Sequence, residues 1–226
     1  MKKIIWMSIV LFLFMGTFAF AQSWAAFGYQ MNLTNVGDGA DWKTGHGLKI
    51  LCRFSMLPIN ENIGFGFLFS GRFSFPKEAD WVNPETGDLN KITDAKSILD
   101  YSAFLGASLH GRISGPLGFG IGTGITANWV TAKVDSYYTL MYGKIDLDYN
   151  TFDLGLGLNA GLKLDISRFV IEVGTDFSFS FFKRDSYTFT SEYEWVGASG
   201  IVKSNSVSGG VSILRVSPYI LFGIRF

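Results

Sequence analysis

The last nine residues of the chain, PYILFGIRF at positions 218–226, decide how the rest of the sequence is interpreted. Apolar side chains recur at every second position up to the terminal aromatic residue, namely Ile220, Phe222, Ile224 and Phe226. The intervening positions include Tyr219, Gly223 and Arg225. A period of two is typical of a β-strand with one apolar face. We expect this strand to be paired, because a free apolar edge promotes aggregation.

The beginning of the chain has the organisation of a secretory signal peptide. Lys2 and Lys3 precede an apolar run over residues 4–20, and Ala19-Phe20-Ala21 has the small-x-small form of a signal-peptidase site. We therefore expect residues 1–21 to be a cleaved signal peptide and residues 22–226 to form the mature domain. The alternative is an uncleaved helical anchor, since the run is nearly long enough to span a membrane.

The composition points to a membrane protein without membrane helices. The chain is 48% hydrophobic and 16% aromatic, yet after Phe20 no stretch approaches the ~20 apolar residues of a membrane helix. Local alternation within an apolar composition is typical of a transmembrane β-barrel. Without Lys2 and Lys3, 17 basic residues face 19 acidic ones, a formal charge of −2, so nucleic acid is not an expected partner. The single cysteine, Cys52, excludes an internal disulfide.

The period-two pattern recurs in eight segments that are joined alternately by short turns and long connections. Short turns are expected near Pro58, Gly115 and Ser167. Long polar connections are expected at residues 34–46, 76–97, 131–150 and 183–209. The expected strands cover residues 25–33, 47–57, 63–75, 98–113, 117–130, 152–164, 169–182 and a last segment after Ser208.

Short turns at one end and long loops at the other are the arrangement of an outer-membrane barrel. The predicted fold class is therefore all-β, an eight-stranded antiparallel transmembrane β-barrel. The alternative is ten strands, if a long connection contains a further hairpin. Aromatic residues at both ends of the strands predict two interfacial girdles. They are Tyr101, Trp129 and Phe152 at the long loops, and Phe54, Phe119, Phe169 and Phe226 at the short turns.

The signal peptide, four hairpins, outward apolar faces and terminal Phe226 together resemble the small outer-membrane barrels of the OmpA transmembrane domain, OmpX and OmpW type. The resemblance covers the mature chain and is one of architecture. It implies a bacterial outer-membrane location after export, with outer-membrane lipid around the barrel. It also implies that Phe226 is an assembly signal for the barrel-assembly machinery.

Strand parity predicts a charged network inside the barrel. The inward residues would be Lys49, Arg53, Arg72, Asp100, Arg112, Asp153, Lys163, Glu172, Asp176, Arg215 and Arg225. Charged groups in a narrow lumen must form ion pairs or be hydrated. The interior of an eight-stranded barrel is only wide enough for side chains to fill it. We therefore predict a largely plugged polar lumen and a structural or surface-interaction role.

A second interpretation of the lumen rests on its glycine content. The expected inward faces of residues 117–130 and 152–164 are nearly all glycine. Glycines there would either make room for Arg and Tyr side chains from the opposite wall or leave a slim passage. The alternative function is therefore a narrow channel or carrier for small solutes.

Motifs for catalysis are weak, and the sequence predicts that the chain is not an enzyme. Ser108 and His110 share the inward face, but they lie on one strand without an acid to orient the imidazole. His46 is expected in the first long loop. An outer-membrane lipid-modifying enzyme is the least favoured alternative, and no cofactor or metal is expected. The long loops, with aromatics such as Trp81 and Trp195 among charges, are a candidate surface for an extracellular ligand.

Overall fold

The computed structural model describes residues 23–35, 41–82, 89–92, 95–134, 144–193, 198–206 and 213–226. The expected signal peptide, residues 1–21, lies outside the described residues, and so does Trp195. Across the described ranges, no helix combines the length and the apolarity that crossing a membrane requires.

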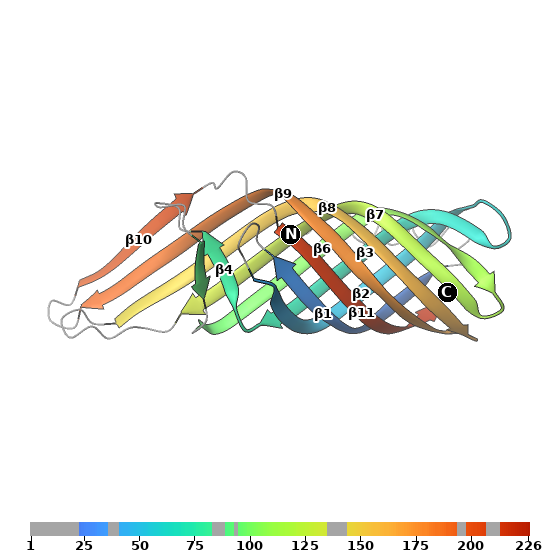
Figure 1. Ribbon diagram of the computed structural model, residues 1–226, viewed down its shortest axis with the longest axis horizontal. Helices are drawn as coiled ribbons and strands as arrows, with labels where there is room; N and C mark the ends of the chain where they lie inside the picture. The colour runs from blue at the N-terminus through green and yellow to red at the C-terminus, as the bar shows by residue number, and fades with distance from the viewer. Residues whose placement is uncertain are drawn as a thin grey trace, which may run out of the picture.

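Eight long antiparallel strands form a closed ring (Figure 1). They are β1 (Trp24–Asn35), β2 (Lys43–Pro58), β3 (Ile63–Pro76), β6 (Ala95–Ser114), β7 (Leu117–Val134), β8 (Lys144–Ile166), β9 (Phe169–Tyr193) and β11 (Ile213–Arg225). Each pairs with the next, and β11 pairs back onto β1, from Trp24 opposite Arg225 to Asn35 opposite Leu214. Because the ring closes, its strands bond to each other all the way round. The predicted eight-stranded antiparallel barrel is confirmed.

Three shorter strands lie outside the ring. β4 (Ala79–Val82) and β5 (Leu89–Ile92) form a separate two-stranded sheet, and β10 (Ala198–Ser206) pairs with the outer half of β9. Two of the expected long connections therefore contain hairpin pairing, β4 with β5 and β10 with the outer half of β9. The ten-strand alternative is nevertheless wrong, because none of these additional segments adds a strand to the closed ring.

The strands β8 and β9 are much longer than the sequence pattern predicts. Their pairing continues to Lys144 opposite Glu192, well beyond the expected ends at residues 152 and 182. The apolar alternation stops near Phe182, but the backbone ladder does not. Together with β10 they form the sheet that projects at the left of Figure 1. Side-chain periodicity therefore marks only the part of these strands that has an apolar outer face.

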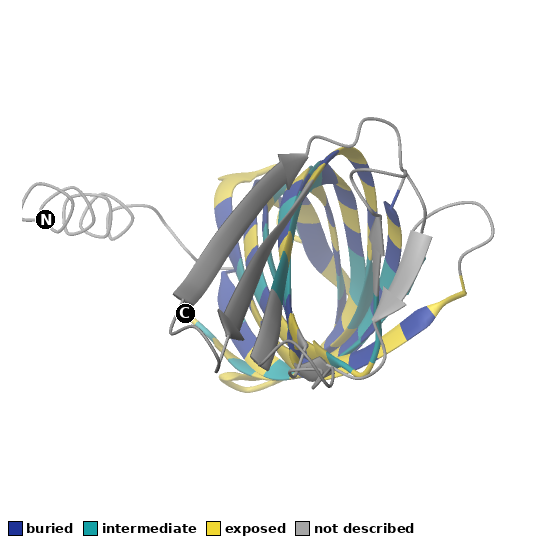
Figure 2. Cartoon of the chain, turned by 90° about the vertical axis from the view of Figure 1, so that its left-hand side faces the viewer, coloured by how far each residue is buried: buried dark blue, intermediate teal, exposed yellow. Residues whose placement is uncertain are grey.

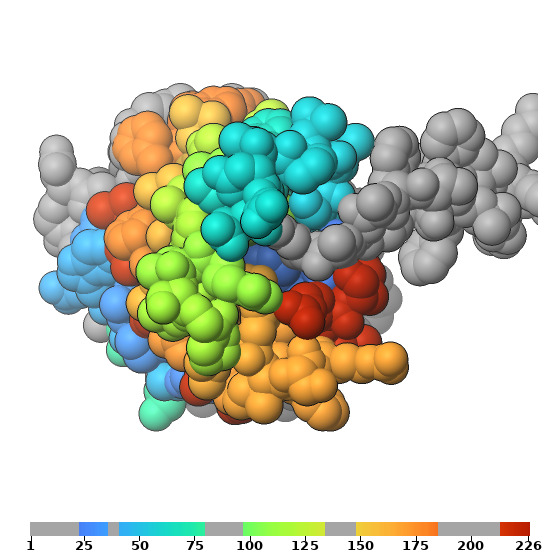
Figure 3. Space-filling model, turned by 90° about the vertical axis from the view of Figure 1, so that its right-hand side faces the viewer, coloured from blue at the N-terminus to red at the C-terminus, as the bar shows by residue number. Residues whose placement is uncertain are grey.

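Tight turns connect the strands at the other end, where the sequence predicts them. The β6–β7 and β8–β9 turns are two residues long and begin with positive φ, 51° at Gly115 and 59° at Ser167. In the β2–β3 turn, the Asn60 side chain accepts hydrogen bonds of 2.8 Å from the backbone N–H groups of Asn62 and Ile63. These turns lie side by side with the C-terminus on the face shown in Figure 3.

Burial alternates along every ring strand, which produces the banding in Figure 2. The outward side chains are large and apolar, and Phe67, Ile125 and Phe222 are each more than half exposed. The inward face is mixed, because an apolar cluster shares it with the polar groups. The cluster contains Trp24, Ala26, Leu51, Leu68, Phe104, Val170, Tyr219 and Leu221. The interior is therefore a packed core.

Candidate functional site: the side-chain network inside the barrel

Arg53 of β2 reaches across the barrel toward the far wall. Its guanidinium donates to the Ser108 hydroxyl at 2.9 Å, to the Asn159 side-chain carbonyl and to Glu172 Oε1 at 3.2 Å. These partners come from β6, β8 and β9. The Arg53 side chain is fully buried, so one charged group ties four strands together in the half of the barrel nearest the tight turns.

Trp24, at the start of β1, fills the same end of the lumen. Its indole N–H donates to Glu172 Oε2 at 2.7 Å, and its ring meets the His110 ring edge-on at 5.2 Å. The Lys163 ammonium lies 4.2 Å from the Trp24 ring centroid and forms an ion pair of 3.2 Å with Asp165. A cation over an aromatic face is an attractive arrangement, and it is stronger away from water.

Asp176 is the centre of the middle layer. It accepts from Lys49 at 2.5 Å, from Gln30 at 3.0 Å and from the Asn159 amide at 2.6 Å. The Lys49 ammonium also lies 3.8 Å from the centroid of the Tyr219 ring. The buried lysine is therefore compensated by a carboxylate and an aromatic face, as a charge removed from water must be.

Toward the long loops, Arg72 of β3 joins three further strands. It pairs with Asp100 of β6 at 3.2 Å and donates to Asn32 of β1 at 3.2 Å and to Ser217 of β11 at 3.1 Å. The Asn32 amide in turn donates to Asp100 at 2.5 Å. Each polar group in this layer therefore orients its neighbour.

The pair formed by Arg215 of β11 and Asp153 of β8 completes this layer. Two guanidinium nitrogens contact the two carboxylate oxygens at 2.9 and 2.6 Å, a bidentate arrangement. Asp153 also accepts from the Ser180 hydroxyl at 2.5 Å and from the Asn128 amide at 2.8 Å. Bidentate, charge-assisted bonds are among the strongest and most geometrically specific contacts in proteins.

The glycine-rich wall of β7 and β8 accommodates these long side chains. A Cβ atom built on Gly120 would lie 2.6 Å from the Arg53 guanidinium carbon, and one on Gly157 would lie 2.6 Å from the Phe104 ring. Such distances are far shorter than side-chain packing allows. Of the two predicted uses of the glycines, the structure has the first: side chains from the opposite wall occupy the space.

The structure brings most of the predicted network residues together inside the barrel. The interior ones are Lys49, Arg53, Arg72, Asp100, Asp153, Lys163, Glu172, Asp176 and Arg215. Two predicted members lie elsewhere. Arg112 is exposed two residues before the end of β6, although it still pairs in register with Gly118. Arg225 is at the rim, a third exposed, with Asp165 at 3.8 Å and the Ser167 carbonyl at 3.3 Å.

Charge alone missed several members of the network. Gln30, Asn32 and Ser217 have inward parity, and counting every inward position, charged or not, finds them. Trp24 lies one residue before the predicted first strand, so only the longer β1 of the structure includes it. Lys183 is different, because a register shift at Leu154/Gly155 leaves both Phe181 and Phe182 facing outward and turns Lys183 inward. Unbroken alternation predicts the opposite orientation for that residue.

A small recess lies at the long-loop end, where the network stops. Its volume is about 40 Å³, and its charged lining residues are Lys43, Glu78, Asp100, Lys183 and Arg215. Lys43 forms an ion pair of 3.3 Å with Glu78. The recess holds little more than one or two water molecules by volume.

The two histidines lie in different environments. His110 is buried with Nδ1 3.3 Å from the Ser108 hydroxyl, and that hydroxyl also accepts from Arg53, so the pair is enclosed in the packed interior. His46 was expected in a loop, but it lies in β2 and faces outward, where its Nδ1 is 2.5 Å from the Tyr29 hydroxyl. The sequence prediction for His46 is wrong because β2 begins earlier than its apolar alternation.

Comparison with known proteins gives likeness at the level of the fold. No protein-family model matches the chain, and no curated protein sequence matches it significantly. Among solved structures, it is similar to Ail, the attachment invasion locus protein of Yersinia pestis, with 14% identity and a TM-score of 0.47 over 90% of this chain and 97% of that one. A major outer membrane protein from Thermus thermophilus is 15% identical, with a TM-score of 0.48 over 89% and 99% of the two chains. The closed ring of eight antiparallel strands is itself the architecture that the predicted resemblance to small outer-membrane barrels implies.

A third similar structure corrects one prediction. It is the outer membrane protease OmpT from Escherichia coli, 10% identical, with a TM-score of 0.41 over 90% of this chain and 96% of that one. An enzyme is therefore found among the similar structures, and the prediction from weak catalytic motifs that the chain is not an enzyme is wrong as a statement of what the sequence shows. The likeness concerns the fold and assigns no activity to this chain.

Proposed function

We propose that the protein is an integral outer-membrane β-barrel with a structural or surface-interaction role and a lumen closed by its own side chains. The observation that carries this proposal is the set of arginines that span the interior. Arg53 is buried in the half nearest the tight turns, and Arg72 and Arg215 are buried in the layer toward the long loops. Each bonds to partners on other strands of the wall. A hydrated pore would need to displace these bonds at every level.

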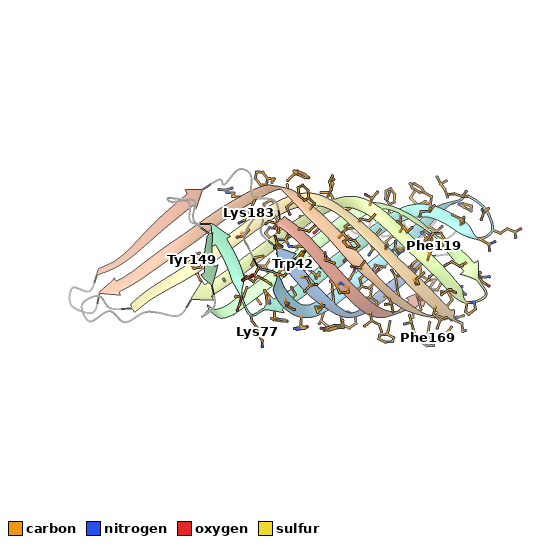
Figure 4. The ribbon with its side chains drawn as sticks, viewed as in Figure 1. Trp42, Lys77, Phe119, Tyr149, Phe169 and Lys183 are labelled. Atoms are coloured by element: carbon orange, nitrogen blue, oxygen red, sulfur yellow. The ribbon has the colours of Figure 1, made fainter. Side chains whose placement is uncertain are left out.

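The outer surface supports the membrane location. A ring of Phe, Leu and Ile side chains covers the barrel from the tight turns to Phe152 and Phe182. Soluble proteins rarely expose contiguous apolar patches larger than a few hundred Å², whereas an apolar band is what lipid requires. Figure 4 shows this fringe of side chains, with Phe119 and Phe169 at the tight-turn end.

Conductance in planar bilayers tests the closed lumen. The wild-type protein is expected to show no steady current, whereas Arg53→Ala, which removes the group that crosses the barrel, is expected to admit ions. Arg184→Ala is a matched control, since Arg184 is exposed on the outer face of β9. A reproducible wild-type conductance that changes on replacing Arg72 or Asp153 would overturn the proposal.

The second candidate is a narrow channel or carrier for small solutes. The recess beside Lys43 and Lys183 favours it, because its charged lining lies at the long-loop end of the interior, where a small polar solute would arrive. The same bilayer experiment separates the two candidates. Selective current or solute uptake by the unmodified protein is the result that the channel predicts.

The export route and partners belong to the same proposal. Cleavage after Ala21 would leave Gln22 as the first residue, which the intact mass of the protein purified from cell envelopes reports directly. Phe226, half exposed at the barrel base, would be read by the barrel-assembly machinery. The segments at residues 76–97 and 183–209, which include β4, β5, the outer half of β9 and β10, would meet an extracellular ligand. Loss of cell-surface binding when either segment is replaced tests that role.

A further inference from the structure

A continuous belt of aromatic side chains marks the level at which the apolar surface ends toward the long loops. Neighbouring rings in this belt lie close together. The distance between ring centroids is 6.3 Å for Phe73 and Tyr101, 6.3 Å for Tyr101 and Trp129, and 5.2 Å for Trp129 and Phe152. Phe152 in turn contacts Phe182. Such belts lie at the depth of the lipid headgroups.

A polar pair interrupts the apolar outer surface at this level on β1 and β2. The Tyr29 hydroxyl and His46 Nδ1 are 2.5 Å apart, and the two rings stack with centroids separated by 6.0 Å. Both side chains are exposed, and His46 is opposite Phe75 of β3 in the strand register. The hydrogen bond orients the imidazole ring while leaving its other nitrogen available to a ligand.

A lysine and a tryptophan lie just beyond this pair. Lys77 follows the end of β3, two residues after Phe75, and Trp42 precedes β2, with about half of its side chain exposed. Figure 4 shows both on the long-loop side of the barrel. Within the described ranges, no carboxylate lies within 4.0 Å of the Lys77 ammonium, whereas nearby Lys43 is paired with Glu78.

We propose that Tyr29, Trp42, His46 and Lys77 form a binding site for the anionic phosphate headgroup of a membrane lipid, here called the β1–β3 rim site. This inference rests on the proposed membrane location. Lys77 supplies the positive charge and His46 a ring nitrogen as donor, while the two aromatic side chains have the amphipathic character that suits an interface.

The surface below the rim site favours a lipid over a soluble anion. Apolar side chains cover the outer surface from the rim site toward the middle of the barrel. They are Leu48, Ile50 and Phe73, each between about one-third and one-half exposed. A lipid whose phosphate contacts Lys77 would lay its acyl chains along these side chains. A free phosphate would gain the charge contact alone.

Native mass spectrometry of the full chain in detergent tests the site. The protein is offered equal amounts of dimyristoyl phosphatidic acid and dimyristoyl phosphatidylcholine, and retained lipid is counted. Preferential retention of phosphatidic acid is expected. Lys77→Ala is expected to reduce it about fivefold, since a cation at a membrane surface contributes about 1 kcal/mol. His46→Ala is expected to reduce it as well.

Two matched variants show whether the site is specific. Lys133→Ala removes an exposed lysine that already has Asp148 at 4.0 Å. Arg184→Ala removes an exposed cation of β9, which β11 separates from β1 in the ring. Neither is expected to change retention. Equal loss in Arg184→Ala and Lys77→Ala would mean general attraction to the rim and would overturn the site.

Further outcomes separate this inference from the proposed function. A folded barrel that retains both lipids equally would overturn the rim site and leave the membrane proposal standing. If millimolar glycerol phosphate displaces the lipid, the rim site binds a soluble phosphate and the proposed lipid ligand is wrong. A chain that fails to fold in either detergent or lipid would overturn the proposed function, and the rim site with it.

Discussion

At the scale of single residues, the interior depends on pairs of very small and very large side chains. Gly120 leaves the space into which the Arg53 guanidinium fits, and Gly161 does the same for the Tyr219 hydroxyl, 2.8 Å from a Cβ built at that glycine. The Tyr219 hydroxyl donates to Glu172 at 2.8 Å. A glycine in a strand usually weakens it, but here it permits bonds that cross the lumen.

Gly120→Ala tests whether the Arg53 side chain needs the space that this glycine leaves. The added methyl group must displace the Arg53 guanidinium, so the free energy of unfolding should fall by roughly 1–3 kcal/mol, the range for overpacking a core. Denaturant unfolding of the protein in lipid vesicles measures the change. Gly71→Ala is the matched control, because nothing lies within 4 Å of a Cβ at Gly71. If Gly71→Ala destabilises the protein as much as Gly120→Ala does, the space left for Arg53 does not explain the effect.

At the scale of elements, the two ends of the chain complete the ring. β1 and β11 pair over most of their length, and the Phe226 amide donates to the Ser23 carbonyl at 3.1 Å. The Phe226 ring also packs near Phe54 of β2, with 6.4 Å between centroids. The closing strands therefore carry both the ladder that removes the open edges and the terminal aromatic residue.

Phe226→Ala should impair assembly more than it impairs stability. The change removes the terminal aromatic residue but leaves the β1–β11 ladder intact, so folded protein in the outer membrane should decrease several-fold. Gel mobility of unheated cell-envelope samples measures the folded fraction. Phe222→Ala is the control, because Phe222 is an exposed aromatic side chain of the same strand. Equal losses for the two variants would show that apolar surface, and not the terminal position, matters.

The long strands β8 and β9 combine two environments. β9 continues from Phe182 to Tyr193, roughly 35 Å at the usual rise per residue. This outer part pairs with β8 and β10 but has no place in the closed ring. The wall and the projecting sheet therefore share one backbone ladder.

Protease treatment of intact cells should separate these two parts. We expect cleavage in the projecting sheet and protection of the wall, because backbone within the lipid-facing ring is both hydrogen-bonded and covered. Mass spectrometry of the fragments gives the cut sites. Cuts within residues 153–181 in intact membranes would contradict the assignment of the membrane-embedded part.

At the scale of the whole molecule, charge pairing holds opposite parts of the wall at fixed separations. The Arg215–Asp153 pair is nearly inaccessible to solvent, with exposures of 2% and 0%. The pair is not exceptional, since Arg53 and Arg72 in the interior each have a carboxylate partner as well. Removing one member of a buried pair leaves an uncompensated charge, which costs more than removing both.

A double-mutant cycle on Arg215 and Asp153 measures this coupling. Arg215→Met alone should reduce the free energy of unfolding by roughly 3–5 kcal/mol, because it leaves Asp153 buried without its cation. Adding Asp153→Asn should recover part of the loss. Unfolding in lipid vesicles by denaturant gives all four values. Additive effects of the two substitutions would contradict a direct interaction between these side chains.

The sequence by itself determined the number of wall strands, the positions of the tight turns and the outward face. Those features depend on the period of two, which backbone geometry imposes on every strand that meets lipid on one side. It also indicated which charged residues face inward, except that Arg112 is exposed and Arg225 is one-third exposed at the ends of their strands.

Only the tertiary structure decided which inward groups meet. The partners of Arg53 lie 55, 106 and 119 residues away along the chain, and their alignment depends on the stagger of strands around the ring. The tertiary structure also turned Lys183 inward through an irregularity in the pairing of β8 with β9, and it placed His46 beside Tyr29 on the outer surface. Periodicity describes one strand at a time, whereas contacts across a closed barrel depend on all eight.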